Sequence, residues 1–144
     1  METEKKNIYE EFAAEASAMQ PRSVALRRDL HRHPETGWLE MRTTAIIVRR
    51  LRALGYQVLT GREVCLASAR LGLPDANIMA AHAEAVLQQG VTEEELTPDL
   101  REGFTGAIAI LDCGPGPVVA LRFDIDALGM VECPEPTHRP TREG

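Results

Sequence analysis

The sequence is poor in aromatic residues and cysteine, and it has no long hydrophobic run. Aromatic side chains make up 4% of the 144 residues, so a core must be built mainly from Leu, Val, Ile and Ala. The three cysteines, Cys65, Cys113 and Cys133, are odd in number and lack CxxC spacing, which argues against a disulfide framework. No apolar run reaches the length of a membrane span, and no signal-peptide-like segment follows the charged N-terminus. We therefore expect a cytoplasmic protein.

An excess of positive charge is also absent. The formal net charge is -6 and the sequence pI is about 5.2, which argues against nucleic acid or an anionic membrane as the main partner. Basic residues cluster at 27–28 and 49–52, but both clusters fall on helical patterns, where a solvated helix face is the favoured interpretation. A hydrophobic content of 44% is enough for one domain with a core.

Hydrophobic periodicity predicts four helices, and the clearest is the third. Its apolar side chains recur on one face, arginines occupy its last turns, and Gly55 follows directly. The second helix starts at Pro21 and ends before Pro34, because proline disfavours helical geometry in the residue that precedes it. The four predicted helices span 7–19, 21–33, 38–54 and 76–89.

Three short strands are predicted, at 56–59, 104–111 and 117–124. The order helix, glycine, strand around Gly55 is typical of α/β proteins. The turn at 114–117 is so short that the two strands on either side of it must be antiparallel neighbours. The sequence therefore predicts an α/β fold with a mixed sheet.

The segment 117–128 combines a buried-strand pattern with two carboxylates. Asp124 and Asp126 lie two positions apart, so on a strand they point to the same face, past the end where α/β sheets place their sites. Two close carboxylates repel each other unless a cation or a shared proton lies between them. A bound divalent metal is one interpretation. The other is a solvated turn in which Asp126 caps the segment that follows.

Other residues that could bind a metal each have a simpler interpretation. His31 and His33 do not share a helix face, and they lie near the negative end of a helix, where histidine is favoured. His82 is a lone helical histidine, which is usually structural. Cys133 and His138 lie in a stretch without periodic apolar positions, where an ordinary loop is favoured.

Two longer motifs and four shorter ones together resemble metallopeptidase family 20, in its amidohydrolase branch. Residues 26–35, LRRDLHRHPE, with Glu40, resemble the opening signature of that branch. Residues 122–128, RFDIDAL, are similar to its RxDxDAL strand end. The shorter motifs, which resemble the aminobenzoyl-glutamate hydrolases within the branch, lie at 60–64, 72–75, 103–106 and 138–140.

This resemblance implies a fold and an activity. The chain would be the N-terminal part of a three-layer α/β/α zinc-peptidase-like catalytic domain, incomplete within residues 1–144 and lacking the dimerisation domain. The complete enzyme would hydrolyse the amide bond of N-acyl amino acids such as p-aminobenzoyl-glutamate. Manganese or zinc would activate water, and a glutamate would act as general base. The enzyme would form a homodimer or associate with a partner subunit.

The resemblance also implies roles for the two aspartates. The strand end of the wider family reads His-x-Asp, in which the histidine binds the metal and the aspartate orients it. Asp126 would then be the orienting residue, while Asp124 replaces the histidine and its role stays open. Because the family's Cys-Gly-His ligand segment is missing, we expect this chain alone to bind no metal and to be inactive. The alternative is a non-catalytic α/β module that associates with a partner chain.

Overall fold

The computed structural model describes residues 7–130, which fall into two units, 7–34 and 35–130. Two sites named from the sequence, Cys133 and His138, lie outside the described residues. Within 7–130, no helix combines the length and the apolar character that crossing a bilayer requires.

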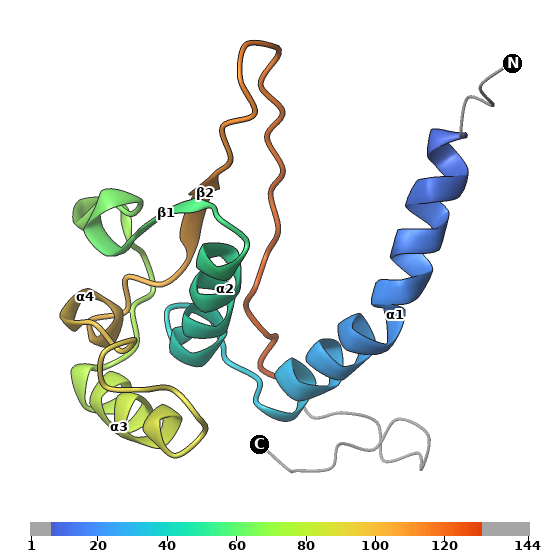
Figure 1. Cartoon of the computed structure of the whole chain (residues 1–144). Helices are drawn as coiled ribbons and strands as arrows, with labels where there is room; N and C mark the ends of the chain where they lie inside the picture. Colours follow the sequence, from blue (N-terminus) through green and yellow to red (C-terminus); the bar gives the residue numbers. More distant parts are fainter. Residues whose placement is uncertain (1–6, 131–144) are drawn as a thin grey trace, which may run out of the picture. The chain divides into compact units, whose positions relative to one another are not determined.

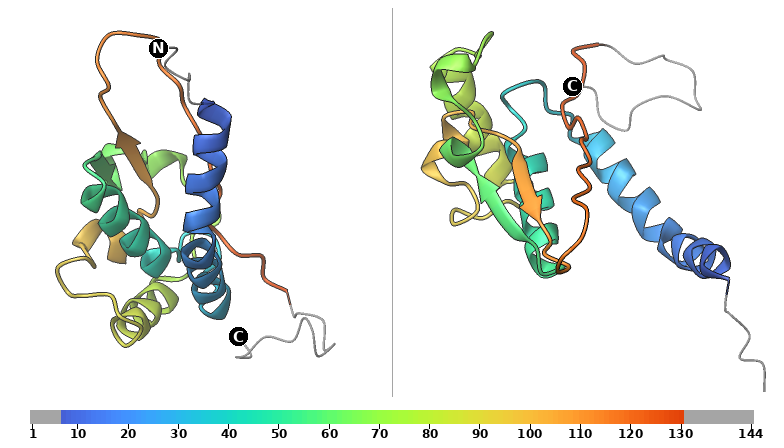
Figure 2. Two further views of the ribbon diagram at one scale, coloured as in Figure 1. Left: turned by 45° about the vertical axis from the view of Figure 1, so that its right-hand side comes forward. Right: turned by 90° about the horizontal axis from the view of Figure 1, so that it is seen from above.

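The first unit is a single helix, α1, Ile8–Arg32 (Figure 1). The sequence predicts two helices here, 7–19 and 21–33, and this division is wrong because the helix continues through Pro21. A proline inside a helix removes one backbone hydrogen bond and bends the axis, but it does not have to end the helix. Figures 1 and 2 show α1 changing direction partway along its length.

The second unit contains a two-stranded antiparallel sheet and three further helices. Helix α2 contacts both strands and α3, and both views in Figure 2 show the strands beside α2. The strands pair with Gln57 opposite Ile110 and Thr60 opposite Ala107. The elements are α2 (Met41–Ala53), β1 (Gln57–Thr60), the short turns η1 (Gly61–Glu63) and η2 (Ala67–Ala69), α3 (Ala76–Leu87), α4 (Pro98–Arg101) and β2 (Ala107–Ile110).

The core of this unit lies between α2, α3 and the segment that carries α4. Met41 and Ala45 lie one helical turn apart on α2, and Ala83 and Val86 are similarly spaced on α3, so each pair faces the same side of its helix. As the composition predicts, the core is mostly aliphatic. The buried hydrophobic residues are Met41, Ala45, Ala83, Val86, Val91, Leu96, Leu100 and Phe104.

The α/β class predicted from the sequence is confirmed. The helices predicted at 38–54 and 76–89 are observed as α2 and α3, each shorter by two to four residues. The strands predicted at 56–59 and 104–111 are observed as β1 and β2. They pair with each other, so the described sheet is antiparallel, and the three-layer domain with a mixed sheet stays a prediction for a complete protein.

The strand predicted at 117–124 is absent from the structure. Residues 111–128 instead leave β2, turn at Gly114 and return without strand pairing, as the orange and red trace in Figure 1 shows. Val118 is 95% exposed and Phe123 is 76% exposed. An apolar run becomes a buried strand only where a partner strand and a covering surface exist, and residues 7–130 supply neither to this segment. The predicted antiparallel pair formed with 104–111 is therefore wrong.

Candidate functional site

A buried carboxylate, Glu35, organises the start of α2. Its oxygen Oε1 accepts hydrogen bonds from the peptide N–H of Arg42 and from Nε2 of His82, both at 2.8 Å. Its other oxygen accepts the peptide N–H of Thr43 at 2.6 Å. A negative charge is favourable at this position because the first N–H groups of a helix have no partner within the helix. Glu35 therefore caps α2 and ties it to α3 through His82.

The backbone of Glu35 makes a second connection. Its carbonyl oxygen accepts a hydrogen bond from the peptide N–H of Ala127 at 2.7 Å. This bond joins the HRHPE motif to the RFDIDAL motif, which lie near opposite ends of the described chain. Asp126, the residue before Ala127, is consequently held beside the loop that leads into α2.

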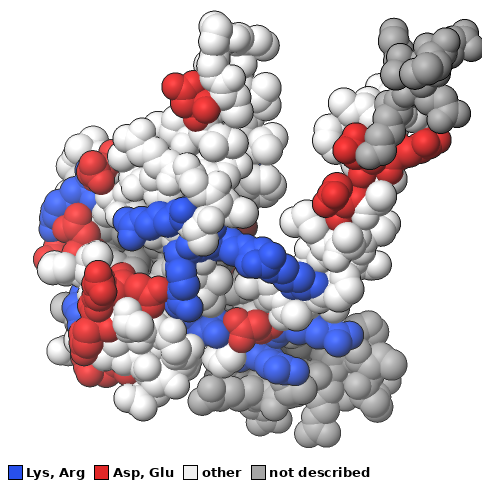
Figure 3. Space-filling model, viewed as in Figure 1, with Lys and Arg blue, Asp and Glu red and all other residues white. Residues whose placement is uncertain are grey.

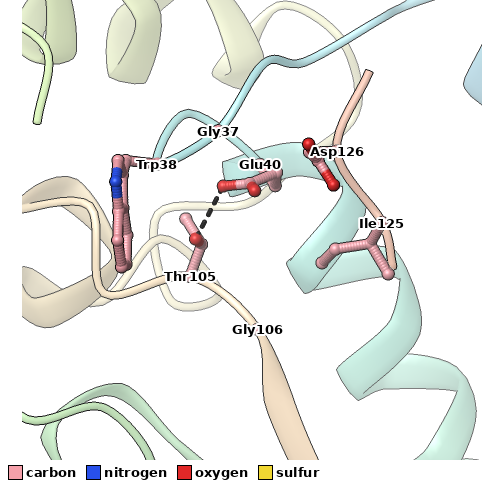
Figure 4. A pocket seen from close by; sticks show the side chains of 7 residues that line it. All are labelled: Gly37, Trp38, Glu40, Thr105, Gly106, Ile125 and Asp126. Carbon is pink, nitrogen blue, oxygen red and sulfur yellow. Dashed lines mark hydrogen bonds between the residues drawn. The ribbon is translucent and has the colours of Figure 1, made fainter. Parts of the chain in front are cut away.

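Asp126 lines a cavity of about 330 Å³ between this loop and the start of β2 (Figure 4). In Figure 4, Trp38 lies at one side of the cavity and Asp126 with Ile125 at the other, and Glu40 lies between them. The remaining lining residues are Gly37, Thr105 and Gly106. The cavity therefore combines apolar walls with two carboxylates.

Glu40 fixes one wall of this cavity. It is the N-cap residue of α2 and is 8% exposed. The hydroxyl of Thr105 donates a hydrogen bond of 2.7 Å to its carboxylate, and the N–H of Gly106 donates one of 2.9 Å to Oγ1 of Thr44. These two bonds join the residues just before β2 to the first turn of α2.

Trp38 forms the wall opposite Ile125 and Asp126, and its backbone is strained. Its φ is +67°, a region that non-glycine residues avoid and that is often found at functional sites. The indole N–H donates a hydrogen bond of 2.8 Å to the carbonyl of Leu71. The guanidinium of Arg70 lies 5.9 Å from the indole ring and 3.5 Å from the ring of Phe104. The side chain of Trp38 is thus held from a segment distant in sequence.

A network of charged side chains lies next to Phe104, whose ring is also contacted by Arg70. The guanidinium of Arg62 lies 4.1 Å from the ring of Phe104 and pairs with both Asp99 and Glu102. The backbone N–H of Arg62, together with its guanidinium, holds the pKa of Asp99 below its ordinary value of 3.8. Figure 3 shows acidic and basic side chains intermixed at the left of the view, over the part of the unit where Figure 1 labels α4. The ring of Phe104 therefore lies against two guanidinium groups, of which that of Arg62 is paired with carboxylates.

The structure separates the two aspartates that the sequence places together. Asp124 accepts a hydrogen bond of 2.7 Å from Arg122, is exposed, and does not line the cavity. The sequence predicts a positive partner for close carboxylates, and for Asp124 this partner is Arg122. Within residues 7–130, no three residues of the types His, Cys, Asp and Glu are arranged to hold a metal ion.

His33 and His82 each have a polar partner that fits a structural role. Nδ1 of His33 lies 2.9 Å from the carbonyl oxygen of Asp29, one turn earlier, at the C-cap of α1. His82 pairs with Glu35, as described above.

The sequence interpretation missed the roles of Trp38, Glu35 and Thr105. Glu35 and Glu40 belong to a motif that carries the family resemblance, but the motif by itself gives them no structural role. One available signal is an acidic residue a few positions before a predicted helix, since a negative charge is favourable near a helix N-terminus. Another is the position of the single tryptophan in the loop between two helices.

Three curated proteins are similar to this chain over most of its length. It is 41% identical over 129 residues to a p-aminobenzoyl-glutamate hydrolase subunit of Escherichia coli (strain K12), covering 89% of this chain and 29% of that protein. It is 42% identical over 124 residues to indole-3-acetyl-aspartic acid hydrolase of Enterobacter agglomerans, covering 85% and 28%. A homolog of the first protein, from Haemophilus influenzae (strain ATCC 51907 / DSM 11121 / KW20 / Rd), is 36% identical over 129 residues, covering 84% and 28%. No family model matches the chain.

A solved structure agrees with these similarities. The aminobenzoyl-glutamate utilization protein of Klebsiella pneumoniae matches with a TM-score of 0.77 and 43% identity, over 81% of this chain and 30% of that one. The chain thus spans less than a third of the length of the relatives it matches. The predicted resemblance to aminobenzoyl-glutamate hydrolases is confirmed in both sequence and fold for the segment that the chain spans.

Proposed function

From the premise that this chain shares its sequence and fold with a segment of the aminobenzoyl-glutamate hydrolases, we propose that it is part of a metal-dependent amidohydrolase of metallopeptidase family 20. In this proposal it forms the N-terminal portion of the catalytic domain and is inactive alone. The complete enzyme acts in the cytoplasm on N-acyl amino acids. One such substrate is p-aminobenzoyl-glutamate, a breakdown product of folate.

The similarity to the hydrolases carries this proposal, and the exposed apolar segment 117–128 supports the part of it that makes the chain a portion of a larger assembly. Five of its large apolar side chains are between 73% and 95% exposed, although their pattern is that of a buried strand. An exposed run of this kind marks a surface that another part of a protein covers. The relatives contain the additional polypeptide that such a cover requires, since the chain matches less than a third of their length. The five side chains are those of Val118, Val119, Leu121, Phe123 and Leu128.

In the complete enzyme the proposed role of Asp126 is to orient a metal ligand. The metal, manganese or zinc, would supply an activated water, and its ligands would come from polypeptide beyond residues 7–130. The described residues contribute the placement of Asp126, because the hydrogen bond between Ala127 and Glu35 holds it beside the buried start of α2. Asp124, paired with Arg122 on the surface, receives no role.

A fusion protein tests the proposal directly. Residues 1–144 would be joined to the part of the Escherichia coli relative that lies beyond its match to this chain, and release of p-aminobenzoate would be measured with manganese or zinc present. We expect turnover by the fusion, loss of turnover on chelation, and no turnover by the 144-residue chain alone. Hydrolysis by the chain alone, or a folded but inactive fusion, would contradict the proposal.

The alternative function is a non-catalytic α/β module whose segment 117–128 is covered by a separate partner chain. The same exposed side chains support it, because the cover need not belong to the same polypeptide. A free-standing module should unfold cooperatively on heating, whereas an incomplete domain should not. Calorimetry of the purified chain distinguishes the two, and size-exclusion chromatography shows whether a second copy provides the cover.

A further inference from the structure

We propose that the cavity between Trp38, Glu40 and Asp126 binds the aromatic acyl group of the substrate, by contact with the indole ring and a hydrogen bond from a substrate N–H to Glu40. The inference rests on the proposed function, because it names the part of the substrate that this segment of the enzyme recognises.

The size and walls of the cavity suit a flat ring. Its volume of about 330 Å³ lies at the lower end of the range for small-molecule pockets, about 300–1,000 Å³. Trp38 and Ile125 provide apolar surface on two sides. The other two apolar lining positions, Gly37 and Gly106, carry no side chain, and a Cβ atom at either would meet no atom within 4 Å. The space is therefore open at both glycines.

Trp38 is held as an apolar wall. Its only polar side-chain atom already donates to the carbonyl of Leu71, so the ring offers the cavity no hydrogen-bond donor. Its φ of +67° is a strained conformation that the surrounding contacts maintain. Aromatic ligands favour offset or edge contacts with such a ring.

The polar groups of the cavity select for a donor and against an anion. Glu40 is buried, and Thr105 is bonded to only one of its two oxygens. Asp126 adds a second carboxylate, and no Lys, Arg or His is among the lining residues. Such a cavity accepts N–H groups and repels carboxylates.

This chemistry matches one end of the proposed substrates. The names of two relatives describe an aminobenzoyl group joined to glutamate and an indole-acetyl group joined to aspartate. Both acyl groups are aromatic and carry an N–H donor, whereas both amino acids carry carboxylates. The cavity therefore fits the aromatic end, and the acidic end must bind elsewhere.

The single tryptophan allows binding to be observed in the 144-residue chain itself. A proton–nitrogen NMR spectrum of the labelled chain contains one indole N–H signal, that of Trp38, and it also shows whether the chain is folded. The chain would be titrated with p-aminobenzamide, with benzamide, which lacks the amino group, and with N-acetylglutamate. These compounds present the aromatic end with and without the amino donor on the ring, and the acidic end alone.

We expect p-aminobenzamide to shift the Trp38 signal in a saturable way. Benzamide should bind about tenfold more weakly, because its ring carries no amino group that can donate to the carboxylate of Glu40. N-acetylglutamate should leave the signal unchanged. Equal affinities for the two benzamides, a shift by N-acetylglutamate, or no saturable shift in a folded chain would each overturn the inference.

Two variants sharpen the test. Glu40→Gln should reduce the preference for p-aminobenzamide over benzamide severalfold, about fivefold, because a charged acceptor is replaced by a neutral one. Gly37→Leu should weaken both ligands, because the new side chain occupies open space. Glu63→Gln, an exposed position that does not line the cavity, is the matched control and should leave both affinities unchanged.

The fusion enzyme separates this inference from the proposed function. Binding of p-aminobenzamide by the chain together with an inactive fusion would refute the hydrolase proposal and leave the cavity assignment standing. An active fusion whose KM for p-aminobenzoyl-glutamate is unchanged by Gly37→Leu would refute the cavity assignment alone.

Discussion

The peptide N–H of Ala127 donates a hydrogen bond of 2.7 Å to the carbonyl oxygen of Glu35, which joins the two motifs that most resemble the amidohydrolases. The carboxylate of the same glutamate caps α2 and binds His82 of α3. Glu35 therefore connects three segments, and the position of Asp126 depends on it.

This connection predicts that Glu35→Gln destabilises the chain by about 1–3 kcal/mol, because a buried charge-assisted network is weakened. Urea denaturation followed by circular dichroism would measure the loss. The exposed Glu63→Gln is the control and should stay within about 0.5 kcal/mol of the wild type. Equal stability of the two variants would show that Glu35 does not organise the fold.

Both the backbone conformation of Gly61 and the close approach of Asp99 predict that a side chain is unfavourable at this position. An added Cβ would lie 2.5 Å from the Asp99 carboxylate, at a φ of +64° that favours glycine. Gly114 has a similar positive φ of +90° but nothing within 4 Å. We expect Gly61→Ala to lower the free energy of unfolding by about 1 kcal/mol more than Gly114→Ala does. Equal effects in urea denaturation would mean that the contact with Asp99 is unimportant.

The ion pair of Asp99 predicts a loss of stability in acid. The backbone and side chain of Arg62 lower the pKa of Asp99 below 3.8, so the unfolded chain takes up a proton there before the folded chain does. The stabilisation that the ion pair of Asp99 provides is complete well above pH 3.8, the ordinary pKa of the group. It is lost as the pH falls through the lower pKa of Asp99 in the folded chain. Melting temperatures measured as the pH is lowered should fall less steeply for Asp99→Asn than for the wild type. Parallel curves would contradict the prediction.

Asp126 makes a prediction about the completed enzyme. If it orients a metal ligand, Asp126→Asn in the fusion should lower metal-supported turnover by about 10–100-fold. The affinity for manganese or zinc, measured by metal titration of the apo-fusion, should fall as well. Unchanged turnover and affinity would remove Asp126 from the site.

The metal content of the 144-residue chain gives a further check. Because residues 7–130 contain no arrangement of three His, Cys, Asp or Glu for a metal, we expect no divalent ion after dialysis. Elemental analysis would measure it. One tightly held ion per chain would contradict this expectation and point to ligands that include Cys133 or His138.

How much of the structure the sequence predicts depends on whether the deciding contacts are local. Helix α2 was predictable because its apolar spacing and Gly55 are local signals. Its start at Met41 was not, because the first N–H groups of the helix donate to the carboxylate of Glu35, which lies outside the helix. The prediction of a strand at 117–124 was wrong because an apolar run indicates a tendency to be buried, but not whether a partner strand is present.

The candidate site shows the same division. The pattern around Asp124 and Asp126 drew attention to the segment, but the sequence does not record that Arg122 pairs with Asp124 and that Asp126 lines a cavity. Trp38, Glu40 and Asp126 come together through a backbone hydrogen bond between Glu35 and Ala127. A contact of this kind leaves no periodic trace in the sequence.

The uncovered segment 117–128 also has a consequence for the life of the chain in a cell. An extended apolar stretch with unpaired backbone groups is a template for pairing with other chains and a substrate for proteases. The abundance of the chain in a cell would then depend on how quickly other polypeptide covers this segment, rather than on the stability of the helices and strands already formed. Chaperones that bind extended apolar peptides would compete with that cover for the same residues.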